Sequence, residues 1–257
     1  MKDNKVINGT PANILREQYC SVFTEPMEIY KLENPKDFFK IDTECNNCKN
    51  ETVHECTEDM EYVSYLTDFT VSRDDIEKAI NKMNSNESSG PDGVPAIFYK
   101  KCKHTLSSVI AQIWNISLDQ GKDPVSMKEA ITLPGLKPDS DRTKPESYRP
   151  ISLTPHLSKI FGRVMKDKLQ THLEKNNLIG NFQHGFRSER SCLSQLLEFY
   201  EYVLQCIEEG LNVDVVFLDL AKAFDKVDHG LLAHKMKEKR IGGKVGEWLY
   251  NFLCDRT

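Results

Sequence analysis

The chain has 257 residues, of which 39% are hydrophobic and 28% are charged, and its net charge is −5. This composition is typical of a folded protein with a core of its own, and it argues against low-complexity, collagen-like and disordered chains. The sequence lacks both an apolar run of about 20 residues and the apolar core of a secretory signal. We therefore expect no membrane association, no secretion, and a cytoplasmic or nuclear location.

The cysteines and the distribution of charge refine these expectations. Cysteines spread from Cys20 to Cys254 without a secretory signal are typical of reduced thiols. Residues 1–97 carry 10 Lys and Arg against 19 Asp and Glu, residues 98–190 carry 16 against 9, and residues 191–257 carry 8 against 11. The middle segment is therefore basic enough to bind a polyanion, although basic residues also solvate ordinary helices.

Residues 1–70 are polar and poorly periodic, which predicts an acidic, loosely ordered leader in which the stretch from Ile14 to Phe23 can form a helix. Four soft metal ligands lie within twelve residues of this leader: Cys45, Cys48, His54 and Cys56. Zinc modules usually have a longer spacer between their ligand pairs. The pattern therefore favours a cysteine-rich linker, with a zinc site as the alternative.

Residues 71–257 combine helical and strand patterns, which predicts an α+β domain. Its first helix begins near Ser72, where Ser72 and Asp75 form a capping box, and it ends at residues 84–86. A turn cluster occupies residues 90–95. A long amphipathic helix then runs to Gly121. Its expected apolar side consists of Phe98, Cys102, Leu106, Val109, Ile113 and Trp114.

Further along the chain, short strands and helices alternate. The sequence predicts strands at residues 130–133 and 151–153, on either side of a polar loop at residues 135–149. The most strand-like run of the chain is residues 213–219, which ends in the carboxylate of Asp219. Helices are expected in four further places: residues 157–169, residues 193–207 with Gly210 as the stop, residues 231–239 and residues 245–253.

Four strings of this sequence resemble, in the same order, motifs of the LINE-type reverse transcriptases of non-LTR retrotransposons, in particular the jockey-like group. They are GPDGVP at residues 90–95, YRPISL at 148–153, QHGFR at 183–187, and FLDLAKAFDKVDH at 217–229. The resemblance implies a right-hand polymerase, of which the chain holds the fingers and part of the palm. It also implies RNA-directed DNA synthesis by a two-metal mechanism. An RNA template, a DNA primer and deoxynucleoside triphosphates would be the partners, whereas the oligomeric state stays open.

The resemblance also implies roles for individual residues of the catalytic string. Asp219 would bind both Mg²⁺ ions, and the carbonyl oxygen of Leu220 would help to hold one of them. The ring of Phe224 would fill the space that the 2′-hydroxyl of a ribonucleotide needs, and would so select deoxynucleotides. Without the resemblance, the sequence favours a turn or capping role for Asp219 over a metal ligand, and Phe224 is equally consistent with ordinary core packing.

Basic residues within or near the other strings would contact phosphates. Lys137 and Arg149 are expected to contact the incoming triphosphate, where a planar guanidinium binds two oxygens and an ammonium acts as a point charge. Arg187 and Arg190 are expected to contact the backbone of the template or the primer. The alternative for Lys137 and Arg149 is a solvated basic loop.

In this family the palm continues to a Gln-Gly pair and a Tyr-x-Asp-Asp hairpin, which supplies the remaining metal-binding carboxylates. Neither precedes Thr257, and the adjacent pair Asp74 and Asp75 lies at a helix start far upstream. We therefore expect this chain alone to lack polymerase activity. Two further hypotheses are a non-catalytic nucleic-acid-binding remnant and a degraded gene product without a function.

Overall fold

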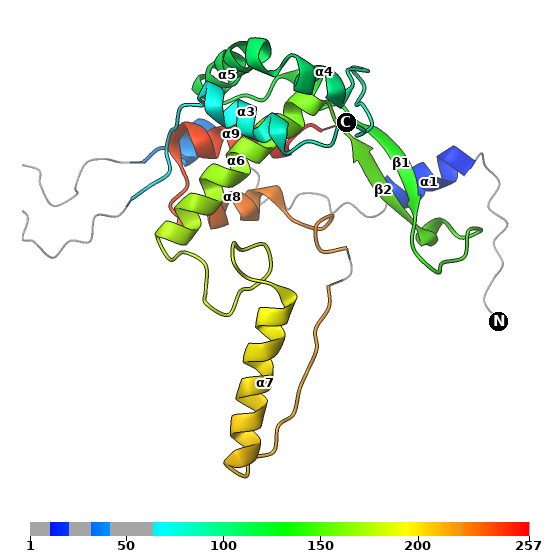
Figure 1. The fold of residues 1–257 in the computed structure, drawn as a ribbon, viewed down its shortest axis with the longest axis vertical. Coiled ribbons are helices and arrows are strands. Elements are labelled where there is room, and N and C mark those ends of the chain that lie inside the picture. Colours follow the sequence, from blue (N-terminus) through cyan, green and yellow to red (C-terminus); the bar gives the residue numbers. More distant parts are fainter. Residues whose placement is uncertain (1–10, 21–31, 42–63, 221, 257) are drawn as a thin grey trace, which may run out of the picture. The chain divides into compact units, whose positions relative to one another are not determined.

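The computed structural model describes residues 11–20, 32–41, 64–220 and 222–256 (Figure 1). These residues form helices and one two-stranded sheet, which confirms the predicted mixture of helix and strand. No helix among them has the length and apolar character that a membrane crossing requires.

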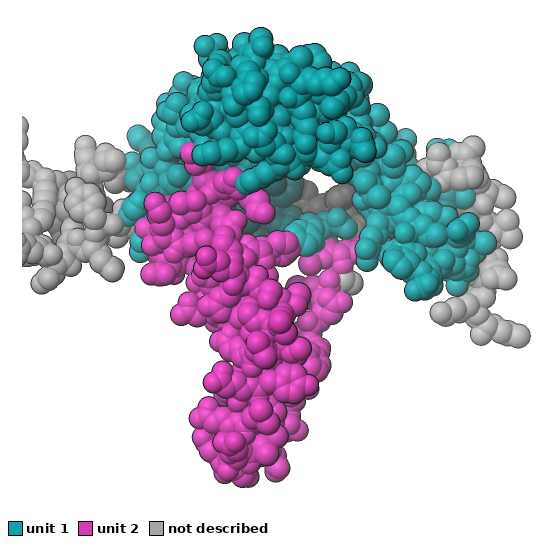
Figure 2. All heavy atoms as spheres, in the orientation of Figure 1, with its two compact units in different colours: residues 1–165, 224–257 teal, residues 166–223 magenta. Residues whose placement is uncertain are grey.

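The chain divides into two compact units, coloured separately in Figure 2. The first unit consists of residues 1–165 and 224–257, and the second consists of residues 166–223. The elements in chain order are α1 (Pro11–Cys20), α2 (Pro35–Phe38), α3 (Arg73–Asn81), α4 (Ala96–Lys101), α5 (Lys103–Asp119), η2 (Val125–Met127), β1 (Ile131–Leu136), η3 (Pro145–Ser147), β2 (Tyr148–Leu153), α6 (His156–Lys175), α7 (Cys192–Glu208), α8 (His229–Glu238) and α9 (Gly243–Leu253).

Aromatic side chains join distant segments in the core of the first unit. The ring of Trp114 on α5 stacks on the ring of Phe161 on α6, with centroids 4.1 Å apart. Trp248 on α9 meets both rings edge-on, and its Nε1 donates to Ser117 Oγ at 2.8 Å. Aromatic rings combine a large buried area with preferred edge-to-face geometry. This cluster therefore holds α5, α6 and α9 together.

The predicted start of the first helix, α3, is confirmed. Ser72 Oγ accepts a hydrogen bond from the N–H of Asp75, and the Asp75 carboxylate accepts one from the N–H of Ser72. This capping box supplies acceptors for two N–H groups that have no carbonyl partner within the helix. Before the cap, the N–H and carbonyl of Val71 both bond to the side-chain amide of Asn115 on α5. The first turn of α3 is therefore fixed to α5.

The prediction of one long helix from residue 96 to Gly121 is wrong. The backbone leaves helical geometry at Cys102 and separates α4 from α5. Of the expected apolar side, only Trp114 is buried. Three of the expected members, Phe98, Val109 and Ile113, are exposed. The buried side of α5 consists instead of Ser107, Ile110, Ala111, Trp114, Ser117 and Leu118.

The two predicted strands are confirmed as an antiparallel pair, and each is longer than expected. Gly135 and Arg149, placed at the ends of the expected loop, lie in the strands opposite each other. The helices expected around residues 157–169, 231–239 and 245–253 are confirmed as α6, α8 and α9. Gly121 follows the end of α5 with φ +63°, a left-handed conformation that suits glycine.

Two segments of the expected leader contribute to the first unit. The carbonyl of Phe39, a residue with a fully buried side chain, accepts a hydrogen bond from the N–H of Gly243 at the start of α9. The N–H of Leu66 donates to the carbonyl of Arg240, and the carbonyl of Leu66 accepts from the N–H of Gly242. These bonds attach both segments to the turn between α8 and α9.

In the second unit, the predicted helix at residues 193–207 is confirmed as α7, which ends before Gly210, but none of its residues is buried. The strand predicted at residues 213–219 is not formed. This run is extended and exposed, and Leu218 within it is 90% exposed. A strand is stabilised by a hydrogen-bonding neighbour, and none of the described residues supplies one.

Candidate functional site

The turn at residues 90–95 lies against the end of β2. A Cβ atom added to Gly90 would come within 2.5 Å of the backbone nitrogen of Pro155, so this close approach requires glycine. Gly93 adopts φ +66°, and its N–H donates to the carbonyl of Gly90. The Asp92 carboxylate accepts from the N–H of Val94 at 3.2 Å. The first unit therefore brings together two strings that are separated by more than fifty residues.

Next to this turn lies a cluster of charged groups that the sequence did not predict. The Glu87 carboxylate lies 3.4 Å from Arg163 and 3.8 Å from Lys159, both on α6. The hydrogen bond from the Asn84 N–H, together with these cations, lowers the pKa of Glu87. His156 begins α6, and burial lowers its pKa. Glu87 follows no helical or strand period, and so no sequence signal marked this cluster.

The β1–β2 hairpin carries the two residues expected to contact the triphosphate. Lys137 directly follows β1, where its N–H bonds to the Ser147 carbonyl and its Nζ donates to the Glu146 carbonyl at 2.7 Å. Arg149 is exposed on β2. Gly135 lies opposite Arg149, and a Cβ atom added to Gly135 would come within 2.5 Å of Cδ1 of Ile151. Both cations lie on one small sheet, and the ammonium of Lys137 has a carbonyl partner.

In the second unit, the turn that contains Arg187 and Arg190 is bound by internal hydrogen bonds. Arg187 donates from Nη1 to the carbonyl of Gly180 at 3.2 Å. His184 is 4% exposed, and Arg190 Nη1 lies 3.2 Å from its Nε2. The Glu198 carboxylate on α7 is 2.6 Å from the same nitrogen. Both expected nucleic-acid contacts thus have partners within the protein.

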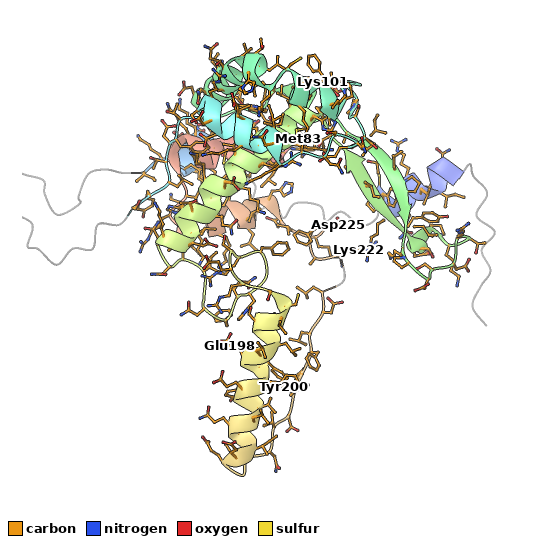
Figure 3. The ribbon with its side chains drawn as sticks, in the orientation of Figure 1. Met83, Lys101, Glu198, Tyr200, Lys222 and Asp225 are labelled. Carbon is orange, nitrogen blue, oxygen red and sulfur yellow. The ribbon has the colours of Figure 1, made fainter. Side chains whose placement is uncertain are left out.

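The residues of the expected catalytic string are exposed to solvent. Asp219 and Leu220 end the extended run of the second unit. Phe224, which is 81% exposed, lies in the turn at residues 222–226, where the first unit resumes. Lys222 and Asp225 mark this turn in Figure 3, and Lys222 adopts φ +56°. Core packing, the alternative for Phe224, does not describe its ring in this structure.

The described residues contain no group of three His, Cys, Asp or Glu side chains placed to hold a metal ion. A two-ion centre needs several oxygen ligands, and Asp219 supplies a single carboxylate. The residues in place around Asp219 therefore do not by themselves fit a pair of Mg²⁺ ions. The possible zinc ligands Cys45, Cys48, His54 and Cys56 lie outside the described residues.

Residues 136–257 match the family "Reverse transcriptase (RNA-dependent DNA polymerase)". The chain is 31% identical over 165 residues to the "Probable RNA-directed DNA polymerase from transposon BS" of Drosophila melanogaster, which covers 64% of this chain. It is 30% identical over 167 residues to the "RNA-directed DNA polymerase from mobile element jockey" of the same species, which covers 65% of this chain. In both comparisons the chain spans 18% of the relative's length.

A third similar protein, the "Probable RNA-directed DNA polymerase from transposon X-element" of Drosophila melanogaster, is 27% identical over 164 residues, or 64% of this chain and 18% of that protein. The family match begins at Leu136, the last residue of β1, and includes β2, the turn that carries His184, and Asp219. Residues 136–257 therefore match a reverse transcriptase domain, and the chain is similar to the RNA-directed DNA polymerases of the BS, jockey and X-element transposons.

Proposed function

We propose that the chain supplies the fingers and the early palm of an RNA-directed DNA polymerase. The complete polymerase would add deoxynucleotides to the 3′-hydroxyl of a DNA primer on an RNA template. The observation that carries this proposal is the match of residues 136–257 to the reverse transcriptase family. The Gly90 turn supports it, because it packs against the end of β2 although it lies outside the matched range.

Asp219 is the proposed catalytic carboxylate and, with the carbonyl oxygen of Leu220, a ligand of Mg²⁺. The exposure of both residues supports this assignment, since a metal ligand of a polymerase must be accessible to the nucleotide. Bound Mg²⁺ would activate the primer hydroxyl and stabilise the leaving pyrophosphate. Phe224 is the proposed filter against ribonucleotides, and the exposure of its residue, 81%, supports a contact with the nucleotide.

We assign phosphate contacts to four basic residues that lie within or near the motifs at residues 148–153 and 183–187. Arg149 is the better placed triphosphate ligand, because its residue is exposed on β2 and a guanidinium can bind two phosphate oxygens. Lys137 would have to give up the bond from its Nζ to the Glu146 carbonyl. Arg187 and Arg190 are the proposed contacts to the nucleic-acid backbone.

The binding part of this proposal is tested with the 257-residue chain and a labelled RNA template annealed to a DNA primer. Fluorescence anisotropy should detect a complex that weakens steadily as salt is added, because phosphate contacts release counterions. Arg149→Gln should reduce binding of a deoxynucleoside triphosphate, whereas Arg73→Gln on α3 serves as the charge-matched control. Absence of binding at low salt, or binding that is insensitive to salt, would contradict the proposal.

The catalytic part is tested by primer extension with Mg²⁺. Incorporation that is lost in Asp219→Asn but kept in Asp214→Asn, at the other end of the same exposed run, would assign the reaction to Asp219. Equal incorporation by both variants would remove Asp219 from the site. Salt-sensitive binding without any incorporation is the outcome expected from a single metal-binding carboxylate, and it also agrees with the second candidate, a non-catalytic nucleic-acid-binding module, for which the basic segment of residues 98–190 is the supporting observation.

A further inference from the structure

Four polar side chains meet at the start of α7 in the second unit. The nearly buried His184 lies with Nδ1 2.9 Å from Ser194 Oγ and with Nε2 2.6 Å from Glu198 Oε2. Arg190 Nη1 is 3.2 Å from the same Nε2 and 3.7 Å from Glu198 Oε2. A histidine and an arginine from the turn thus converge on one oxygen of the Glu198 carboxylate. Figure 3 labels Glu198 on α7.

The two sides of this contact differ in how firmly they are held. When the Ser194 hydroxyl donates to Nδ1 of His184, the proton of the neutral imidazole is on Nε2, which donates to Glu198 Oε2. Ser191 and Ser194 also form the capping box of α7, and so the imidazole is anchored to a regular helix end. The Glu198 side chain, in contrast, is 60% exposed and reaches the site through a flexible stem.

The electrostatic potential at the start of α7 favours an anion. No acidic residue lies in the first turn of α7, so no side chain there offsets the partial positive charge of the helix start. Arg190 lies directly before the N-cap residue Ser191 and adds a full positive charge. Arg187 is a weaker candidate for an anion contact, because its Nη1 already donates to the Gly180 carbonyl.

We propose that His184 and Arg190 form a phosphate-binding subsite, and that Glu198 occupies this subsite as an internal competitor when nucleic acid is absent. A phosphate oxygen would accept from His184 Nε2 and from the Arg190 guanidinium in place of Glu198 Oε2. The ion pair between Arg190 and Glu198 joins two partly exposed side chains and contributes little net stability, so a phosphate can displace the carboxylate. The identification of the phosphate as that of a nucleic-acid backbone rests on the proposed function.

Glu198→Gln tests this proposal, with Glu201→Gln on the same helix as the control. Both variants remove one negative charge from α7, so they change the overall field alike. Only Glu198→Gln removes the charge that competes for His184 and Arg190. By anisotropy at low salt, Glu198→Gln should bind single-stranded RNA roughly three- to tenfold more tightly than Glu201→Gln does.

A double-mutant cycle assigns the gain to Arg190. Arg190→Gln should weaken binding, and the double variant Arg190→Gln with Glu198→Gln should show no gain over Arg190→Gln alone. Equal affinities of Glu198→Gln and Glu201→Gln, or a full gain in the double variant, would show that Glu198 does not compete with the phosphate. Binding of RNA by the wild type would still leave the proposed function intact. If neither the wild type nor Glu198→Gln binds RNA at low salt, both proposals fail.

Discussion

Helices α5 and α7 both consist of 17 residues and both have an apolar side, yet only α5 is covered. In the first unit, Trp114 of α5 is 1% exposed and packs against rings from α6 and α9. In the second unit, Leu197 of α7 is 62% exposed, and no residue of that helix is buried. The comparison teaches that amphipathic periodicity selects the side of a helix but does not supply the surface that covers it.

The largest effect that tests this comparison is expected from Trp114→Ala. It removes a ring that stacks on Phe161 and lies against Trp248, and should lower the free energy of unfolding by about 3–5 kcal/mol. Leu197→Ala removes an exposed side chain and should change it by less than about 0.5 kcal/mol. Urea denaturation followed by circular dichroism measures both. Similar losses in the two variants would show that α7 is covered in solution.

The buried carboxylate of Asp123 in the first unit should make the stability of the fold depend on pH. Burial raises the pKa of Asp123 to about 6, opposed by the charges of Arg256 and Lys128. Because this pKa lies above that of the unfolded chain, the folded state binds the proton more tightly, and stability is lost as the pH rises from about 4 to 6. Asp123→Asn should abolish this loss, on the order of 2–3 kcal/mol. Urea titrations at pH 4 and pH 7 test it. The same pH dependence in both proteins would refute it.

Two glycines of the first unit should respond in opposite directions to alanine. Gly90→Ala places a Cβ 2.5 Å from the backbone of Pro155 and should destabilise by about 1–3 kcal/mol. Gly162→Ala lies within α6, where an added Cβ meets nothing within 4 Å, and should stabilise by about 0.5–1 kcal/mol. Thermal denaturation of the two variants measures the difference. A stable Gly90→Ala variant would mean that the turn does not lie against the end of β2.

The smallest effect on stability is expected in the exposed run of the second unit. Asp219→Asn removes a charge that is open to solvent, and should leave the free energy of unfolding within about 0.5 kcal/mol of the wild type. Differential scanning calorimetry checks this value. A larger change would show that Asp219 has a partner within the folded protein, in contrast to its exposure.

Local signals predicted much of the fold. The capping box at Ser72, the two strands of the hairpin and the helices after residue 155 follow from patterns confined to a few turns or one strand. The break at Cys102 and the buried side of α5 could not be predicted in this way. They depend on the position of Trp114 against α6 and α9, and these helices are distant along the chain.

For the candidate site, the sequence predicted which residues belong to it but not the contacts that these residues make. Lys137 and Arg149 were expected in one loop and are on one hairpin. The bond from Lys137 to the Glu146 carbonyl and the contact of Arg190 with Glu198 follow only from three-dimensional proximity. The strand expected at residues 213–219 shows the same limit, since a strand depends on a neighbour that its own sequence does not encode.

By itself, the sequence determined where most of the helices lie, that Ser72 caps the first predicted one, and the motif order that resembles that of a non-LTR reverse transcriptase. These properties depend on residues close together in the chain, so spacing and propensity suffice. The tertiary structure alone decided which apolar sides are covered, that Gly90 must be glycine, and that Glu198 occupies the donors of His184 and Arg190. Burial and charge pairing join residues that are far apart in sequence, and only the folded chain brings them together.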